Sequence, residues 1–80
     1  MPRSRSSPRY ARLCGLLAQA RQASGLTQVE LAAKLKRPQS FVSKYEAGER
    51  RLDVVEFLEV ADGIGCDPVE IVRTLAAEDR

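Results

Sequence analysis

Residues 26–46 restrict the fold more than any other part of the sequence, because they carry the signals of two short helices and a turn between them. Thr27 and Glu30 have the spacing of a capping box. In such a box the threonine hydroxyl accepts a hydrogen bond from the amide of Glu30, and the glutamate carboxylate accepts one from the amide of Thr27. The pair predicts a helix that begins at Gln28. Apolar residues then recur at helical spacing as far as Leu35.

A second helix is predicted after a break at Pro38. Proline cannot donate a helical hydrogen bond, and it disfavours helical geometry at the preceding residue, Arg37. We expect Pro38 in the first turn of the second helix and Gly48, in the left-handed conformation, at its end. Val42 and Tyr45 lie three residues apart and are expected to face the core. The outer face is then polar and consists of Gln39, Ser40, Ser43 and Lys44.

Three more helices are predicted from local signals on either side of this segment. One begins at Pro8 and ends near Gly25, and the last one runs to about Ala77. Five helices and no predicted strand indicate an all-α fold. The two later helices begin at further capping boxes, formed by Asp53 with Glu56 and by Asp67 with Pro68 and Glu70.

Three short motifs in and around the two central helices match a known family. They are Thr27 with Gln28, Leu31 with Ala32, and the run Ser43, Lys44, Tyr45, Glu46, Ala47 and Gly48. The segment resembles the helix-turn-helix of the lambda-repressor and Cro-like family, also called the XRE family, over roughly residues 9 to 75. This resemblance implies a compact five-helix bundle in which the second and third helices form the DNA-binding motif. Pro38 departs from the family, which usually has Ser or Thr at that cap.

One domain is predicted over residues 8–77, with a tail at 78–80. Residues 1–7 are polar and basic, and they have two interpretations. They form either a disordered tail or an arm that follows the DNA backbone or enters a minor groove through Arg3 and Arg5.

Charge is sorted along the chain. Residues 1–52 carry eleven basic and three acidic side chains, a net charge of +8, whereas residues 53–80 carry two basic and eight acidic ones, a net charge of −6. The first part attracts phosphate and the second part is repelled by it, so the electric field itself favours one orientation on a duplex.

Base contacts are assigned to the outer face of the second central helix. Gln39, Ser40 and Lys44 align with positions that touch base edges in the family, near the helix end that enters the major groove. Glutamine bonds adenine in a bidentate way, and lysine favours the acceptors of guanine. Ser43 is expected on a base or a phosphate. Phe41 has two interpretations: it contacts a thymine methyl, or it packs back into the core.

Phosphate contacts are expected from side chains that flank the two helices. Arg21 and Glu46 have a different role, because both lie on the inward sides of their helices and the matching family positions form a structural ion pair. The expected phosphate contacts are Gln28, Lys36, Arg37, Arg50 and Arg51.

Several classes of site are not expected. Cys14 and Cys66 are far apart in a chain without histidine, so they predict small apolar side chains in or near the core rather than a zinc site. No residue set indicates catalysis, and we expect no metal, cofactor or small-molecule ligand. The chain has no signal-peptide pattern and no apolar run of the length that spans a bilayer, so a cytoplasmic protein without membrane contact is expected.

The resemblance implies a sequence-specific, double-stranded DNA-binding transcriptional regulator: a phage-type repressor, a restriction controller or an antitoxin-like protein. A homodimer on a two-fold symmetric operator is expected, since one short helix reads few base pairs. Val72 on the last helix is expected to contact the second copy, and the alternative is that its side chain completes the core. The competing class is a helical protein-interaction module, which the polar face with Lys44 disfavours. The expected dimer contacts are Val69, Val72, Arg73 and Ala76.

Overall fold

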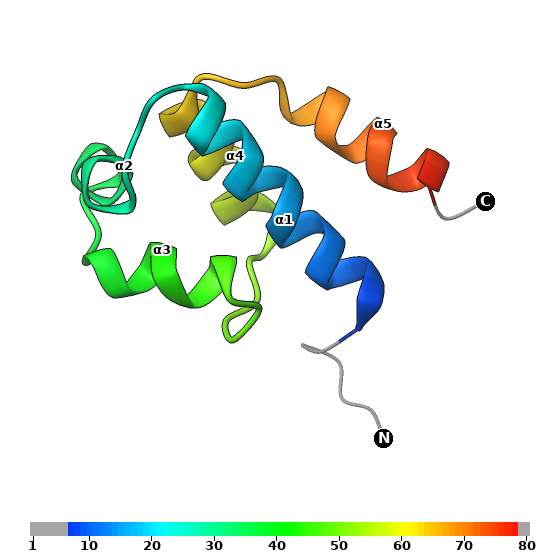
Figure 1. The fold of residues 1–80 in the computed structure, drawn as a ribbon, viewed down its shortest axis with the longest axis horizontal. Coiled ribbons are helices and arrows are strands. Elements are labelled where there is room, and N and C mark those ends of the chain that lie inside the picture. Colours follow the sequence, from blue (N-terminus) through cyan, green and yellow to red (C-terminus); the bar gives the residue numbers. More distant parts are fainter. Residues whose placement is uncertain (1–6, 79–80) are drawn as a thin grey trace.

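The computed structural model describes residues 7–78 of the 80-residue chain, and every regular element in that range is a helix. The all-α, five-helix architecture expected from the sequence is therefore confirmed (Figure 1). Arg3 and Arg5, which were expected in a basic arm, lie outside the described residues. The helices are α1 (Pro8–Ala23), α2 (Gln28–Leu35), α3 (Gln39–Glu46), α4 (Val54–Ile64) and α5 (Pro68–Glu78).

Side-chain caps define where four of these helices begin. Ser7 accepts from the amide of Tyr10, and Thr27 and Asp53 each take part in a complete capping box. The third expected box is not formed, because Asp67 accepts from the amide of Val69, two residues on, at 2.9 Å. Its expected partner, Glu70, instead lies 3.5 Å from the guanidinium of Arg73. Pro68, at the first position of α5, has no amide hydrogen, so that position needs no acceptor.

The turn between α2 and α3 depends on Lys36. Its backbone is left-handed, with φ of 58° and ψ of 42°. The amide of Arg37 then donates to the carbonyl of Ala32 at 3.0 Å, which closes α2. Pro38 caps α3 from an extended conformation with ψ of 152°, one position before the first helical turn in which it was expected. Because proline has no side-chain acceptor, α3 begins without a side-chain cap bond.

All five helices contribute to the core, with Leu17 from α1, Leu31 from α2, Val42 and Tyr45 from α3, Val60 from α4 and Ile71 from α5. Its fully buried side chains include Tyr45 and Val42, so the inward face predicted for α3 is confirmed. Cys14 is buried and Cys66 is half-buried, and both are free thiols. Burial raises the pKa of each thiol above its usual value. The cysteines are thus core side chains, as the sequence indicated.

The two ends of the molecule differ in composition. α2 and α3 lie at one end and α5 at the other (Figure 1), although acids of the second part of the sequence also pair with arginines of the first, as Glu56 does with Arg50. The last helix continues one residue beyond the expected boundary, to Glu78, because Arg12 on α1 bonds that carboxylate at 2.7 and 2.9 Å. No helix in residues 7–78 combines the length and apolar character needed to cross a bilayer.

Candidate nucleic-acid interface

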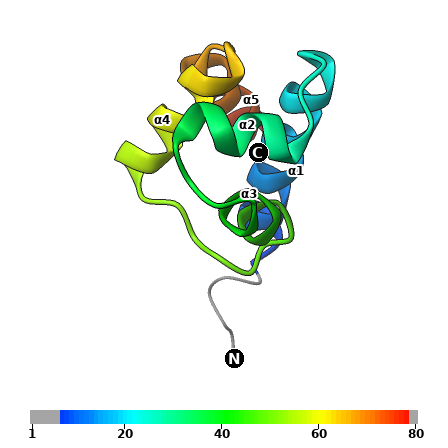
Figure 2. The same cartoon turned by 90° about the vertical axis from the view of Figure 1, so that its left-hand side faces the viewer.

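The outer face of α3 is polar and accessible. Gln39, Ser40 and Lys44 are exposed, and Ser43 is partly covered. The Ser43 hydroxyl donates to the carbonyl of Ser40 at 3.3 Å, so part of its bonding capacity is used within the helix. Figure 2 looks onto the end of the molecule formed by α2 and α3. Three of the four polar residues expected to touch bases are therefore open to a ligand at this end.

A chain of hydrogen bonds fixes the amino end of α3 against α2. The side-chain amide of Gln39 donates to the Gln28 carbonyl oxygen Oε1 at 2.9 Å, and the Gln28 amide donates to Glu46 Oε1 at 2.9 Å. Glu46 also accepts two bonds from Arg21, at 2.7 and 3.1 Å. The ion pair expected between Arg21 and Glu46 is thus present, and it anchors Gln28 and, through Gln28, Gln39.

This chain of hydrogen bonds leaves Gln39 with the two side-chain groups that recognise adenine. A glutamine amide has two N–H donors and a carbonyl acceptor. One Gln39 donor is used by Gln28. The second donor and the carbonyl oxygen remain, and these are the two groups that a bidentate contact with adenine N7 and N6 requires. Because the side chain is held before DNA binds, less rotamer entropy is lost on contact.

Phe41 belongs to the core and not to the outer face. Only 7% of its surface is exposed, and its ring meets the Tyr45 ring edge-on with centroids 5.5 Å apart. Of the two arrangements considered for Phe41, the structure contains the core arrangement. The expected contact between Phe41 and a thymine methyl is therefore wrong. The physical reason is that the guanidiniums of Arg37 and Arg50 cover the ring, at 4.4 and 4.9 Å from its centroid.

The basic residues that flank α3 are not equivalent. Lys36 is exposed, and Arg51 lies over the ring of Tyr10 with the guanidinium 4.5 Å from its centroid. Arg50 instead donates to both carboxylate oxygens of Glu56, at 3.0 and 2.9 Å. Arg37 lies 3.6 Å from the same carboxylate. Two of the five expected phosphate contacts are thus already bound to an acid on α4.

Glu56, which the sequence pattern assigns only to a helix cap, also accepts two hydrogen bonds from Arg50. The hydrogen bonds from Arg50, and then the amide of Asp53, lower the pKa of Glu56 from 4.5 to about 2. It is therefore ionised throughout the physiological range. No local signal distinguished it from other capping glutamates, because both arginines reach it through the tertiary fold.

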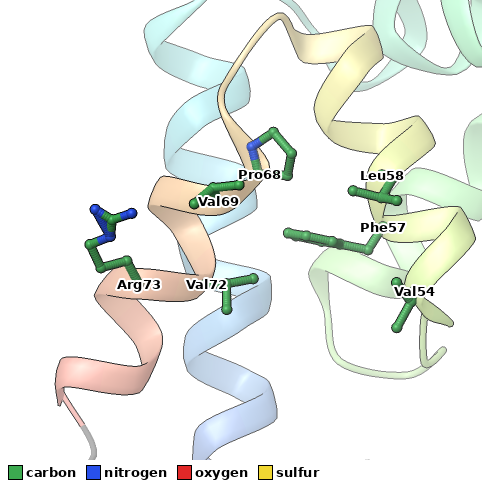
Figure 3. A pocket seen from close by; sticks show the side chains of 7 residues that line it. All are labelled: Val54, Phe57, Leu58, Pro68, Val69, Val72 and Arg73. Carbon is green, nitrogen blue, oxygen red and sulfur yellow. The ribbon is translucent and has the colours of Figure 1, made fainter.

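A second surface lies between α4 and α5, and its α5 side is at the end of the molecule opposite α2 and α3 (Figure 1). Val69 and Val72 are 57% and 51% exposed, so Val72 does not complete the core. Ala76 is also exposed, and Arg73 is paired on the surface with Glu70. The groove has a volume of about 520 Å³, and Figure 3 shows the side chains of both helices around it. It is lined by Val54, Phe57, Leu58, Pro68, Val69, Val72 and Arg73.

The α4 wall of this groove was missed in the sequence. Val54 and Leu58 are 73% and 46% exposed, although α4 already has a complete core stripe. The surplus of apolar residues on α4 was the signal that could have identified it.

In residues 7–78, no cluster of three or more His, Cys, Asp or Glu side chains could hold a metal ion.

Comparisons with known proteins agree with this geometry. A family model described as a helix-turn-helix domain matches residues 9–73. An XRE-family like protein from Pseudomonas syringae pv. tomato str. DC3000 is 56% identical, with a TM-score of 0.85 over 90% of this chain and 88% of that chain. The comparison with curated proteins gave no match.

Two further solved structures share the fold at low sequence identity. The wild-type restriction-modification controller protein C.Esp1396I is 22% identical, with a TM-score of 0.81 over 91% of this chain and 96% of that chain. The tetramer of that controller in complex with its natural 35 base-pair operator matches with the same identity, TM-score and coverage. At this identity the likeness concerns the fold alone.

Proposed function

Because this chain belongs to the XRE family of helix-turn-helix proteins, a family of DNA-binding regulators, we propose that it is a transcriptional regulator that reads a specific duplex sequence as a homodimer. The observation that carries the proposal is the Gln39 side chain, held on the exposed end of α3 by the bond to Gln28. A side chain fixed in this way favours one base over the others, because a wrong base leaves its polar groups unpaired.

In this proposal α3 enters the major groove with its amino end foremost. Gln39 bonds an adenine, Lys44 bonds guanine acceptors, and Ser40 contacts a neighbouring base edge. Ser43 contacts a base or a phosphate with the bonding capacity that its bond to Ser40 leaves. These roles are supported by the exposure of Gln39, Ser40 and Lys44 on one polar face.

Phosphate contacts in this proposal are made around α3. Lys36 and Arg51 are exposed cations on either side of the helix. Gln28 keeps one amide donor beyond its bond to Glu46. Arg37 and Arg50 remain candidates through the guanidinium donors that Glu56 does not take up, since 35% and 38% of their side-chain surfaces are exposed. The net charge of +8 on residues 1–52 gives the long-range attraction.

The second copy is proposed to bind at the groove between α4 and α5. Val69, Val72 and Ala76 are exposed on α5, with the apolar part of Arg73 beside them. The α5 wall of this surface lies at the other end of the molecule from α2 and α3 (Figure 1), so two copies can pair through it and still present both recognition helices. Two such helices on one face of a duplex are about 34 Å apart, which favours a two-fold symmetric operator.

The test is a gel shift with two labelled duplexes. One carries a sequence selected from a random pool by the protein, and the other is a scrambled version of it. The proposal expects the selected duplex to bind about 10³-fold more tightly or better, and both affinities to fall steeply with salt. Equal affinity for the two duplexes contradicts sequence-specific regulation, and no binding to either contradicts the DNA-binding role.

A further inference from the structure

Glu56 joins three segments of the chain through one carboxylate. Oε1 accepts from the amide of Asp53 at 3.1 Å and from Arg50 at 3.0 Å, and Oε2 accepts from Arg50 at 2.9 Å. The Arg37 guanidinium lies 3.6 Å from Oε2. Only 16% of the Glu56 side chain is exposed. The carboxylate is thus covered by the two arginines that it holds.

These two arginines bracket the recognition helix. Arg37 comes before α3 and Arg50 follows it, and both guanidiniums lie over the ring of Phe41. Ring contact and ion pairing act on the same groups, so each guanidinium is restricted in direction. Glu56 and the two arginines together carry a net charge of +1, where the arginines alone would carry +2. The exposed Glu59 is a second and more distant acid, 3.9 Å from Arg37.

The helix cap does not require this charge. Glutamine serves in a capping box as well as glutamate, because the box needs only an acceptor for the amide of residue 53. A negative charge beside the proposed DNA surface also weakens attraction to phosphate at every sequence. The ionised form of Glu56 therefore has an effect on binding that is separable from its effect on folding.

We propose that Glu56 is a specificity-determining positioning residue. It holds Arg37 and Arg50 against Phe41 and neutralises part of their charge, so that the two arginines add less to sequence-independent DNA binding than two unrestrained arginines would. Specific binding keeps its contacts from Gln39 and Lys44, and the ratio of specific to non-specific affinity rises. This inference rests on the proposed function and names the residue that tunes its selectivity.

The experiment compares Glu56→Gln with Asp62→Asn on a random-sequence duplex across a range of salt concentrations. Both variants remove one negative charge from α4, and Asp62 is an exposed residue of the same helix. We expect the affinity of Glu56→Gln for the random duplex at low salt to exceed that of the wild type by a factor of about three or more. The slope of log affinity against log salt concentration should steepen by about 0.9, the value for one phosphate contact. The Asp62→Asn control is expected to change both quantities less, and circular dichroism checks that both variants are folded.

Equal changes in the two variants overturn the inference, because they reduce the effect of Glu56 to net charge. Arg50→Gln gives an independent measurement that does not rely on the folding of the Glu56 variant. Because Glu56 already neutralises Arg50, this substitution should flatten the salt slope by clearly less than one full contact. A salt slope flattened by about 0.9, the value for one full phosphate contact, overturns the inference. Absence of duplex binding by the wild type is a separate result, which rejects the proposed function itself.

Discussion

Arg21 on α1 and Glu46 on α3 form a bidentate ion pair, with Nε 2.7 Å from Oε2 and Nη2 3.1 Å from Oε1. The remaining terminal nitrogen of Arg21 donates to the carbonyl of Leu26, just before α2, at 2.8 Å. Only 11% and 8% of the two side chains are exposed. One arginine thus joins α1 to both ends of the helix-turn-helix.

Glu46→Ala is expected to lower the free energy of unfolding by about 3 kcal/mol, because Arg21 keeps a poorly solvated charge without its partner. Urea unfolding followed by circular dichroism measures the loss. The matched control is Glu78→Ala, which breaks the Arg12 ion pair between side chains that are 42% and 40% exposed. That pair should contribute about 0–1 kcal/mol. Similar losses in the two variants would show that burial of the Arg21 pair has no energetic consequence.

Gln39→Ala should weaken binding to the selected sequence by about 1–3 kcal/mol and relax selection at one or two base positions. Lys36→Ala, which removes an exposed charge beside α3, should weaken all duplexes alike and flatten the salt slope by about 0.9. Selection from a random pool, repeated with each variant, measures the contrast. An unchanged selected motif with Gln39→Ala contradicts the proposed recognition face.

Val72→Glu should convert a dimer to a folded monomer, because a charge in the apolar groove between α4 and α5 is desolvated on association. Sedimentation in the absence of DNA measures the change. Val29→Glu is the control, since Val29 is 63% exposed on α2 and does not line the groove. A wild-type protein that sediments as a monomer at high concentration rules out the dimer.

Glu56 should make the fold sensitive to acid. Its pKa is about 2 in the folded protein and 4.5 otherwise. A carboxylate with a lowered folded-state pKa contributes its full stabilisation above the unfolded value and loses it as the pH falls toward the folded value. The wild type and Glu56→Gln should therefore differ less in their free energies of unfolding as the pH is lowered from about 5 to about 2. Unfolding titrations at several pH values test this, and a constant difference contradicts it.

Two helix glycines should respond differently to alanine. A Cβ at Gly15 on α1 meets no atom within 4 Å, whereas one at Gly63 on α4 lies 2.8 Å from Leu35 Cδ2 and 3.2 Å from Leu31 Cδ1. Gly15→Ala should raise the free energy of unfolding by about 0.5–1 kcal/mol through helix propensity. Gly63→Ala should raise the free energy of unfolding by clearly less than Gly15→Ala does, or should lower it, because the Leu35 side chain must move. Equal gains in chemical denaturation would show that α2 and α4 are packed loosely at this point.

Short-range signals in the sequence were sufficient for the helices. The capping boxes at Thr27 and Asp53 join residues three apart, and the inward position of Val42 and Tyr45 follows from the helical repeat. These features depend on neighbours within one turn, so they can be read without knowledge of the fold. The family resemblance rested on the same local motifs.

Only the tertiary structure decided which polar and aromatic side chains meet. Gln39 and Gln28 lie on different helices, Arg37 and Glu56 are separated by the whole of α3, and Phe41 enters the core because two arginines cover it. The sequence by itself determined the five helices, the core stripe of α3 and the order of charge along the chain. The structure decided that two expected phosphate contacts are held by Glu56 and that α4 shares the apolar groove. The physical reason is that helix caps and apolar stripes are local properties of the chain, whereas ion pairs and ring contacts between helices depend on the angles at which the helices pack.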